Sequence, residues 1–239
     1  MLIDYKAGIV ANLIRANVAK PPTRVLVVGC GTGREAAQLA IALGADVTGI
    51  DIAPRFDPAA GAIATLRQGD ATAMDFPDGA FDLVYSYHAL EHIPDFRRAL
   101  REMRRVLAKD GSYFIGTPNR SRVVGYLGSE GTSLRKKLLW NANDWSARLR
   151  GKFRNEYGAH AGYTRTELQN ELSAAIGPAK NLTLPYYLAV YAGKARYVRL
   201  LDQLGVSSLL FPAIYFIGRR GVTTSAEIVS REVAVQSMR

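Results

Sequence analysis

The stretch Arg24-Val25-Leu26-Val27-Val28-Gly29-Cys30-Gly31-Thr32-Gly33 decides the fold of this 239-residue chain. Its first half is an unbroken apolar run, as in a strand buried at the centre of a parallel sheet. The three glycines allow a tight turn and a close approach of the backbone to a ligand, and a helical pattern follows at 34–43. We interpret the stretch as a nucleotide-binding turn, with a purely structural tight turn as the alternative.

Short β-rich runs and helical patterns alternate around this turn, which is typical of a parallel sheet covered by helices. The predicted fold class is therefore α/β, with a Rossmann-like doubly wound, mostly parallel sheet. Beyond 24–28, we expect strands at 46–50, 62–67, 81–86, 112–117, 182–191 and 213–218. We expect helices at 3–19, 34–43, 94–107 and 164–176, the last one opened by a capping box of Thr164 and Glu167, and one more between the last two strands.

We expect one domain over 1–239, because no repeat or low-complexity tract interrupts the pattern. It divides into an N-terminal helix (1–22), a cofactor-binding core (23–117), an inserted lid segment (118–160) and a C-terminal completion of the sheet (161–239). The apolar run at 204–218 is shorter than the roughly 18–20 residues of a membrane-spanning helix and contains a proline. With no signal-peptide pattern and a single cysteine, Cys30, the expected location is the cytoplasm.

Two acidic residues follow neighbouring predicted strands, where ligands bind in sheets of this kind. Asp51 is placed to accept hydrogen bonds from the two hydroxyls of an adenosine ribose, and Asp70 from the exocyclic amine of an adenine ring. A dinucleotide turn needs a further glycine where this chain has Arg34, so the turn suits a ligand without phosphates. S-adenosylmethionine is such a ligand, with its methionine end at the glycines.

The stretch Val25–Gly33 resembles the first motif of class I S-adenosylmethionine-dependent methyltransferases. Residues 69–71, 76–84, 90–95, 101–107 and 111–112 are similar to further motifs of the small-molecule subgroup, which includes ubiquinone and menaquinone methylases. This resemblance implies a seven-stranded sheet whose last strand is antiparallel. The predicted cofactor site comprises Gly29, Cys30, Gly31, Gly33, Asp51, Ile52, Asp70, Ala71 and Ser86.

One position departs from the family's pattern. The family usually has an acidic residue two positions before the first glycine of the turn, where this chain has Val27. The resemblance gives that acid a role in holding the methionine end of the cofactor. Glu35, at the start of the following helix, is a candidate substitute, and a solvated first-turn carboxylate is the simpler interpretation.

His88 and His160 are the candidate catalytic residues. His88 follows the strand at 81–86, where a side chain can face the transferred methyl group, and His160 ends the inserted segment. The alternatives are structural: His92 anchors a turn, and His160 pins a loop. Tyr87, Tyr157 and Tyr163 are candidates for an aromatic pocket or for packing. No metal site is predicted, because the histidines and the cysteine show no metal-ligand spacing.

The net charge of +10 suits RNA, an anionic membrane or an acidic substrate, or is an inert basic surface. Part of it lies in 134–154, where arginines and lysines alternate with leucines and tryptophans. This pattern fits a lid with a solvated face, a peripheral contact with an anionic membrane or a lipid-like substrate, or a clamp on single-stranded nucleic acid. Without a recognisable RNA-binding motif, nucleic acid is the least favoured partner.

The leading prediction is an S-adenosylmethionine-dependent methyltransferase that acts on a small or amphipathic acceptor by in-line displacement. The alternatives are a catalytically silent methyltransferase-like scaffold and an RNA methyltransferase. An NAD-dependent oxidoreductase is disfavoured by Arg34.

Overall fold

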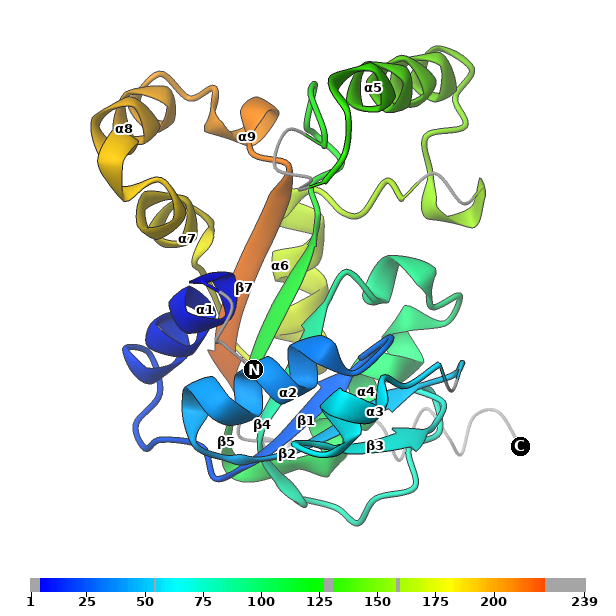
Figure 1. Ribbon diagram of the computed structural model, residues 1–239, viewed down its shortest axis with the longest axis vertical. Helices are drawn as coiled ribbons and strands as arrows, with labels where there is room; N and C mark the ends of the chain where they lie inside the picture. The colour runs from blue at the N-terminus through cyan, green and yellow to red at the C-terminus, as the bar shows by residue number, and fades with distance from the viewer. Residues whose placement is uncertain (1–4, 54, 127–130, 158–159, 222–239) are drawn as a thin grey trace, which may run out of the picture.

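The computed structural model describes residues 5–53, 55–126, 131–157 and 160–221, and these form a seven-stranded sheet between layers of helices (Figure 1). The strand order is β3-β2-β1-β4-β5-β7-β6. The pairs from β3 to β5 are parallel, whereas β7 is antiparallel to both β5 and β6. The predicted Rossmann-like α/β fold with an antiparallel last strand is confirmed.

In the first half of the chain the elements occur in the predicted order, although the predicted helix at 3–19 ends at Arg15 and the strands predicted at 62–67 and 112–117 begin at Thr65 and Leu107. The strands are β1 (Arg24–Val28), β2 (Asp46–Asp51), β3 (Thr65–Gln68), β4 (Phe81–Tyr87), β5 (Leu107–Pro118), β6 (Ala179–Asn181) and β7 (Ala213–Arg219). The helices are α1 (Tyr5–Arg15), α2 (Arg34–Leu43), α3 (Pro58–Gly61), α4 (Phe96–Val106), α5 (Leu134–Leu149), α6 (Arg165–Ala175), α7 (Thr183–Val190), α8 (Ala195–Gln203) and α9 (Ser207–Leu210). Three short 3₁₀ turns are η1 (Leu90–His92), η2 (Asn155–Tyr157) and η3 (Ala192–Lys194).

Two apolar clusters cover the two faces of the sheet, because successive side chains of a strand point to opposite faces. In β1, Val25 and Val27 pack with α1, α2 and α7, whereas Leu26 and Val28 pack with α4 and α6. All four side chains are at most 1% exposed. The continuous apolar run that predicted a central strand is thus explained by helices on both faces.

The prediction of a strand at 182–191 is wrong. These residues form α7, and the short strand β6 ends just before them. Asn181 Oδ1 accepts a hydrogen bond from Thr183 N (2.8 Å) at the start of the helix, and Pro185 lies in the first turn, where proline is tolerated. Tyr186 and Tyr187 then pack on β7 and the segment before it. Tertiary packing has overridden the β propensity of an aromatic run.

Helix α5 stands apart from the sheet. It lies above the carboxyl end of β5, and α8 and α9 lie on the other side of that end (Figure 1). Ser133 caps α5, and none of the helix residues is buried. No helix among the described residues is long and apolar enough to cross a membrane.

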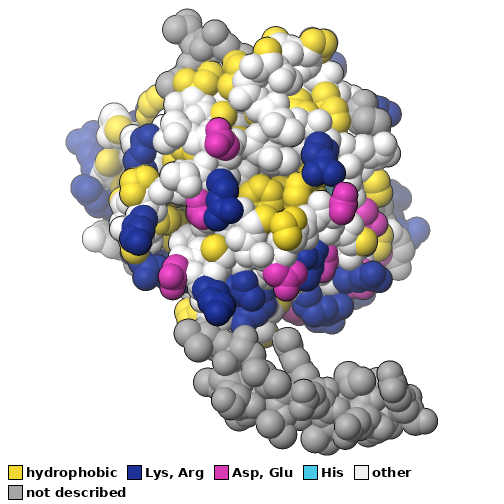
Figure 2. Space-filling model, turned by 90° about the horizontal axis from the view of Figure 1, so that it is seen from below, with side chains coloured by type: hydrophobic (Ala, Val, Ile, Leu, Met, Phe, Trp, Pro, Cys, Tyr) yellow, Lys and Arg dark blue, Asp and Glu magenta, His cyan; other side chains and the backbone are white. Residues whose placement is uncertain are grey.

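Basic and acidic side chains are interspersed on the opposite end of the molecule, seen from below in Figure 2. Among the ion pairs of the core domain, Arg24 at the start of β1 contacts Asp82 of β4 at 2.9 Å. Although burial opposes it, hydrogen bonds from Thr23 and Arg24 lower the pKa of Asp82 to about 2. Some basic side chains of the chain therefore form ion pairs within the fold.

Candidate active site

The glycine turn opens a cavity at the carboxyl ends of β1, β2 and β4, called here the glycine-turn cavity. Six residues predicted for the cofactor line it: Gly29, Gly31, Asp51, Ile52, Asp70 and Ala71. Further lining residues were not predicted: Ile50 of β2, Gly69 and Thr72 beside Asp70, and Ala89, Ile93, Pro94 and Asp95 after β4. Gly69, Ile93, Pro94 and Asp95 lie in motifs quoted for the family resemblance, which was the available signal.

The backbone of the turn requires glycine at its first and last glycine positions. Gly29 has φ +74°, and a Cβ there would lie 2.2 Å from the Cβ of Ala89. Gly33 has φ +83°, and a Cβ there would lie 2.3 Å from Leu66 Cδ1. A Cβ at Gly31 would meet nothing within 4 Å, because this residue faces open space. The turn thus packs tightly against the protein and exposes its backbone on the cavity side.

Asp51 ties the end of β2 to the glycine turn. Its Oδ2 accepts a hydrogen bond from Gly31 N (2.8 Å), and its Oδ1 accepts one from Ala53 N (2.9 Å). A carboxylate has about four acceptor sites, so each oxygen retains room for a ligand hydroxyl. The side chain that the sequence assigns to a ribose is therefore held in place before any ligand arrives.

Asp70 is fixed in a similar way on the far side of the same cavity. Thr72 N and Thr72 Oγ1 both donate to Asp70 Oδ1, at 2.7 and 2.8 Å. These two hydrogen bonds lower the pKa of Asp70, so the group is an ionised acceptor at neutral pH. Ile52, which is 71% exposed, adds an apolar side chain to the wall that a flat ring would cover.

Three predicted cofactor residues lie beneath the cavity. The Ser86 hydroxyl is buried and donates to Val28 O (3.1 Å). The Cys30 side chain packs under Gly49, and Gly33 N donates to Cys30 O. Burial, and then the charge of Asp51, raise the pKa of the Cys30 thiol to about 12. Within the described structure, Cys30, Gly33 and Ser86 support the turn and do not line the cavity.

Val27 is buried at 1% exposure, and its strand partner in β4 is Tyr85. The Tyr85 hydroxyl donates to Glu35 Oε1 at 2.5 Å, so the Glu35 carboxylate is half-buried against the sheet. It lines a cavity beside Tyr87 and Tyr215. The interpretation of Glu35 as a solvated first-turn carboxylate is wrong: the chain places an acid near Val27 from the next helix.

A second cavity, called here the tyrosine chamber, lies beside the glycine-turn cavity. Its aromatic wall consists of Tyr87, Tyr126, Tyr186, Tyr187, Tyr191 and Tyr215. Lys6, Arg122, His88 and His160 add basic side chains to the same chamber. Most of these tyrosines escaped the sequence analysis because they come from α7 and β7, and α7 was expected to be a strand.

His88 lines both cavities and therefore marks the place where they meet. His88, Tyr126 and His160 are the non-glycine residues with positive φ among the described positions, at 51°, 64° and 42°. All three line the tyrosine chamber. Backbone strain of this kind collects at functional sites, where the surrounding fold holds it.

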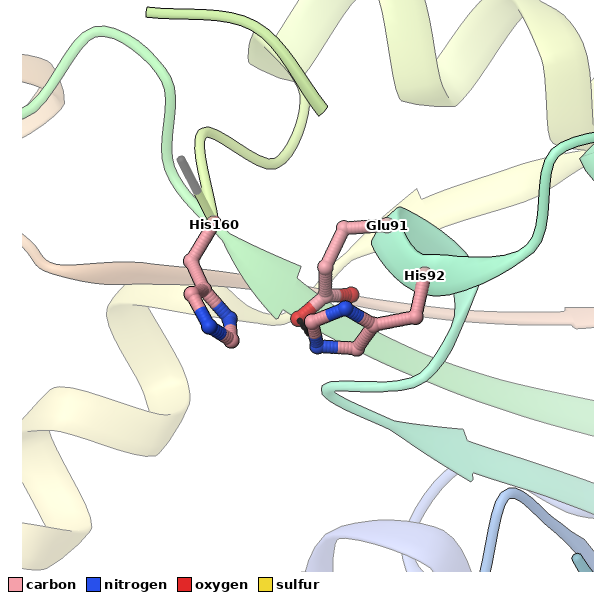
Figure 3. Close-up of side chains that lie close together, drawn as sticks. All are labelled: Glu91, His92 and His160. Carbon is pink, nitrogen blue, oxygen red and sulfur yellow. Dashed lines mark ion pairs between the residues drawn. The ribbon is translucent and has the colours of Figure 1, made fainter. Parts of the chain in front are cut away.

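The three histidines of the chain lie near one buried acid, Glu91, and Figure 3 shows this acid with His92 and His160. The Glu91 side chain is fully buried and lies 3.4 Å from His88 Nδ1 and 3.9 Å from His92 Nε2. The rings of His92 and His160 are 4.6 Å apart, edge to face. Burial, and then His92, lower the pKa of His160. His92 also lines the glycine-turn cavity.

The two remaining tyrosine candidates are not part of the chamber wall as described. Tyr163 is 3% exposed, packs in the apolar cluster of α4 and α6, and donates to Leu90 O (3.2 Å). The packing alternative therefore holds for Tyr163. The side chain of Tyr157 lies outside the described part of the structure.

The glycine turn and the strands around it lie in a part of the chain that is similar to known methyltransferases. Residues 26–115 match the family described as a methyltransferase domain. A ubiquinone biosynthesis O-methyltransferase of Xanthomonas campestris pv. campestris is 34% identical over 136 residues, which cover 54% of this chain and 56% of that protein. A demethylmenaquinone methyltransferase of Thermus thermophilus is 40% identical over 104 residues, which cover 40% of this chain and 47% of that protein. The chain thus spans about half the length of these curated relatives.

A solved structure shares the fold over almost the whole chain. It is described as an S-adenosylmethionine-dependent methyltransferase of Thermotoga maritima, a possible histamine N-methyltransferase, and it has a TM-score of 0.54 at 17% identity. The alignment covers 92% of this chain and 90% of that one. The predicted resemblance to the small-molecule methyltransferases is confirmed. Residues 26–115 are thus similar to methyltransferase domains, and this similarity implies S-adenosylmethionine as the cofactor.

Proposed function

We propose that the chain transfers a methyl group from S-adenosylmethionine to a small, amphipathic acceptor held in the tyrosine chamber. The observation that carries this proposal is the position of His88, which lines both the chamber and the glycine-turn cavity. An acceptor in one cavity and a cofactor in the other would meet at this residue. The relatives, whose names refer to quinone biosynthesis, support an acceptor with an aromatic head.

The residues of the glycine-turn cavity fit the cofactor. Asp51 would bind the ribose hydroxyls, and Asp70 the adenine amine, because both are carboxylates held by backbone hydrogen bonds. Ile52 and Ala71 would lie against the adenine ring. Gly29 and Gly31 would leave room for the methionine end. The bound cofactor supplies an electrophilic methyl group on a sulfonium, so the protein chiefly has to position the acceptor.

His88 is the candidate catalytic residue on the acceptor side, and His160 faces the same chamber. Glu91 Oε1 lies 3.4 Å from His88 Nδ1, which leaves Nε2 of His88 for the acceptor. A hydroxyl acceptor must lose its proton as the new bond forms, and an imidazole in contact with it would take that proton. The tyrosine rings would hold a flat aromatic head, with Lys6 and Arg122 nearby for anionic groups.

Calorimetry with the full chain tests the cofactor assignment. Asp51→Ala should weaken S-adenosylmethionine binding by about 2–3 kcal/mol, because the ribose hydroxyls lose their acceptor. Asp46→Ala, an exposed carboxylate at the other end of β2, is the matched control and should bind normally. Equal affinities of the two variants would contradict the ribose role, and tight binding of NAD alone would replace the methyltransferase with an oxidoreductase.

Transfer of a labelled methyl group separates the remaining alternatives. We expect label in alkyl-substituted hydroquinones and catechols, and His88→Ala should lower kcat while leaving cofactor affinity unchanged. Label recovered only in RNA would favour the RNA methyltransferase. Cofactor binding without transfer to any small acceptor or RNA would favour the silent scaffold.

We also infer a peripheral contact with anionic membranes through residues 134–154. The supporting observation is that α5 exposes Leu134, Leu138 and Leu149 by 69%, 61% and 86% next to arginines and lysines. Such a helix partitions to an anionic surface by apolar burial and charge. It lies above the carboxyl end of β5 (Figure 1), and the last residue of that strand, Pro118, lines the tyrosine chamber.

Sedimentation with phosphatidylcholine vesicles containing phosphatidylserine tests this contact. Arg135→Glu/Lys136→Glu should lower binding at least about tenfold, since each basic residue near the surface contributes about 1 kcal/mol. Lys20→Glu/Lys109→Glu makes the same change in net charge away from α5. An equal loss in both double variants would show that only net charge matters and would remove α5 from the proposal.

A further inference from the structure

Glu91 is a buried acid whose charge has no adequate partner within the described structure. Its side chain is fully buried, and neither carboxylate oxygen accepts a hydrogen bond there. The nearest basic atoms belong to His88 and His92, at 3.4 and 3.9 Å, beyond good hydrogen-bond distance. The Arg122 guanidinium contacts Asp144 at 3.0 Å. Burial of an ionised carboxylate costs several kcal/mol of folding free energy unless a positive charge or hydrogen-bond donors contact it.

The surroundings of Glu91 consist of metal-binding groups. The ligand atoms of Glu91, His92 and His160 all lie within 4.8 Å of one another. Figure 3 shows the two side chains of η1 and the His160 side chain pointing toward a common centre. Two imidazoles and one carboxylate are a donor set suited to zinc and other divalent transition metals.

We propose that Glu91, His92 and His160 bind one divalent transition-metal ion, with zinc as the best match. The absence of a linear ligand spacing led the sequence analysis to predict no metal. That reasoning could not detect a site whose third ligand arrives from the distant end of the inserted segment. Three protein ligands would leave a further coordination position open to solvent or a small ligand.

The geometry needs only a small adjustment. Ligand atoms about 2.1 Å from a tetrahedral ion are about 3.4 Å apart, so the widest pair, which lies within 4.8 Å, must close by at most about 1.4 Å. Rotation of His92, whose side chain is 50% exposed, supplies part of this movement. The backbone of His160 is already held, because the buried Arg122 donates to His160 O (3.3 Å).

The ion would join two parts of the chain that the sheet does not connect. Glu91 and His92 belong to η1, which follows β4, and His160 follows η2 in the segment after α5. Both parts border the place where the glycine-turn cavity meets the tyrosine chamber. His88, beside Glu91 but not a ligand, would act as a hydrogen-bond partner that orients the carboxylate.

Metal binding to the full chain, purified without a histidine tag and stripped with a chelator, tests the proposal. Titration with Zn²⁺ against a chromophoric chelator should show one ion per chain, and Co²⁺ should give the visible absorption of a tetrahedral site. His92→Ala and His160→Ala should each weaken binding by at least about 100-fold. His88→Gln is the control and should lose less than either ligand variant, since groups around a ligand typically contribute about 10- to 100-fold.

A second measurement links the ion to the inserted segment. Zn²⁺ should slow amide hydrogen exchange around residues 160–163 in the wild-type chain and leave it unchanged in His92→Ala, whose altered residue lies elsewhere. Absence of one-to-one binding, or binding that survives both His92→Ala and His160→Ala, would overturn the proposal. Neither measurement depends on methyl transfer.

Discussion

Helices α4 and α5 are both rich in basic residues, and most of those side chains differ in what they contact. In α4, Arg105 donates to the carbonyls of Met74 and Phe76 and pairs with Glu102 and Asp78. The apolar face of α4 is buried between the sheet and α6. In α5, no residue is buried, and leucines and tryptophans are exposed beside the basic groups.

This difference shows how to interpret a net charge of +10. The arginines of α4 hold loops and neighbouring helices: Arg97 pairs with Glu171 of α6, and Arg98 donates to Thr72 O beside the glycine-turn cavity. Their charge is part of the fold and says little about partners. In α5, Arg148 likewise donates to the carbonyls of Arg120 and Arg122. The exposed Arg135 and Lys136 at the start of that helix are therefore the better guide to a binding surface.

The largest expected difference between the two helices is in core packing. Leu100→Ala in α4 should lower the free energy of unfolding by about 3 kcal/mol, because a fully buried side chain leaves a cavity. Leu138→Ala in α5 should change it by less than about 0.5 kcal/mol, since this side chain is 61% exposed. Urea denaturation measures both. A comparable loss in the two variants would mean that α5 is packed in solution.

The next difference concerns arginine. Arg105→Ala should lower the free energy of unfolding by about 2 kcal/mol, because Glu102 and two backbone carbonyls lose a charged donor. Arg135→Ala, at an exposed position of α5, should leave stability unchanged. If both substitutions were neutral in urea denaturation, the contacts of Arg105 would have no net energetic weight.

The effect of pH on the stability that the ion pairs of α4 contribute should be smaller than the effect of Arg105→Ala. Hydrogen bonds and charge from Arg105 lower the pKa of Glu102 below its usual value of 4.5. A carboxylate with a lowered pKa stabilises the fold fully above its ordinary pKa, and the contribution is lost as pH falls through the lowered value. Glu102→Gln should therefore be less stable than wild type at pH 7 by about 1 kcal/mol, and the gap should narrow below pH 4. A constant gap between pH 7 and 3 would contradict this.

The smallest effect is expected for the surface of α5. Arg135→Glu/Lys136→Glu should change the free energy of unfolding by less than about 0.5 kcal/mol, as expected of exposed sites. Urea denaturation measures this change. The same double variant is designed to lose vesicle binding. Loss of both stability and binding would show that the helix is part of the core, and the comparison with α4 would fail.

The sequence was sufficient to predict the cofactor half of the fold. Strand β1, the glycine turn, α2, Asp51 and Asp70 are local patterns, and the parallel sheet brings them to one edge. Boundaries were less accurate: β3 begins at Thr65 rather than 62, and β5 begins at Leu107 rather than 112, through a bulge opposite Phe81 to Leu83. Both differences depend on pairing with neighbours, which a single segment does not encode.

The acceptor half was predicted less well, because its features depend on distant contacts. The aromatic run of α7 has a strand-like composition, and only its packing on Tyr215 and Phe211 makes it a helix. The cluster of Glu91, His92 and His160 depends on the path of the inserted segment. No spacing rule could bring His160 to η1.

Strand β7 lies between β5 and β6, and it is the last strand in chain order among the described residues. During synthesis on the ribosome, β1 to β5 emerge well before Ala213 and Tyr215, which complete the tyrosine chamber. Pairing over so long a stretch of chain is slow compared with local contacts, and β5 is meanwhile an unpaired apolar edge. In a chain made from its N-terminus, the residues of the glycine turn are therefore available well before the strand that completes the tyrosine chamber.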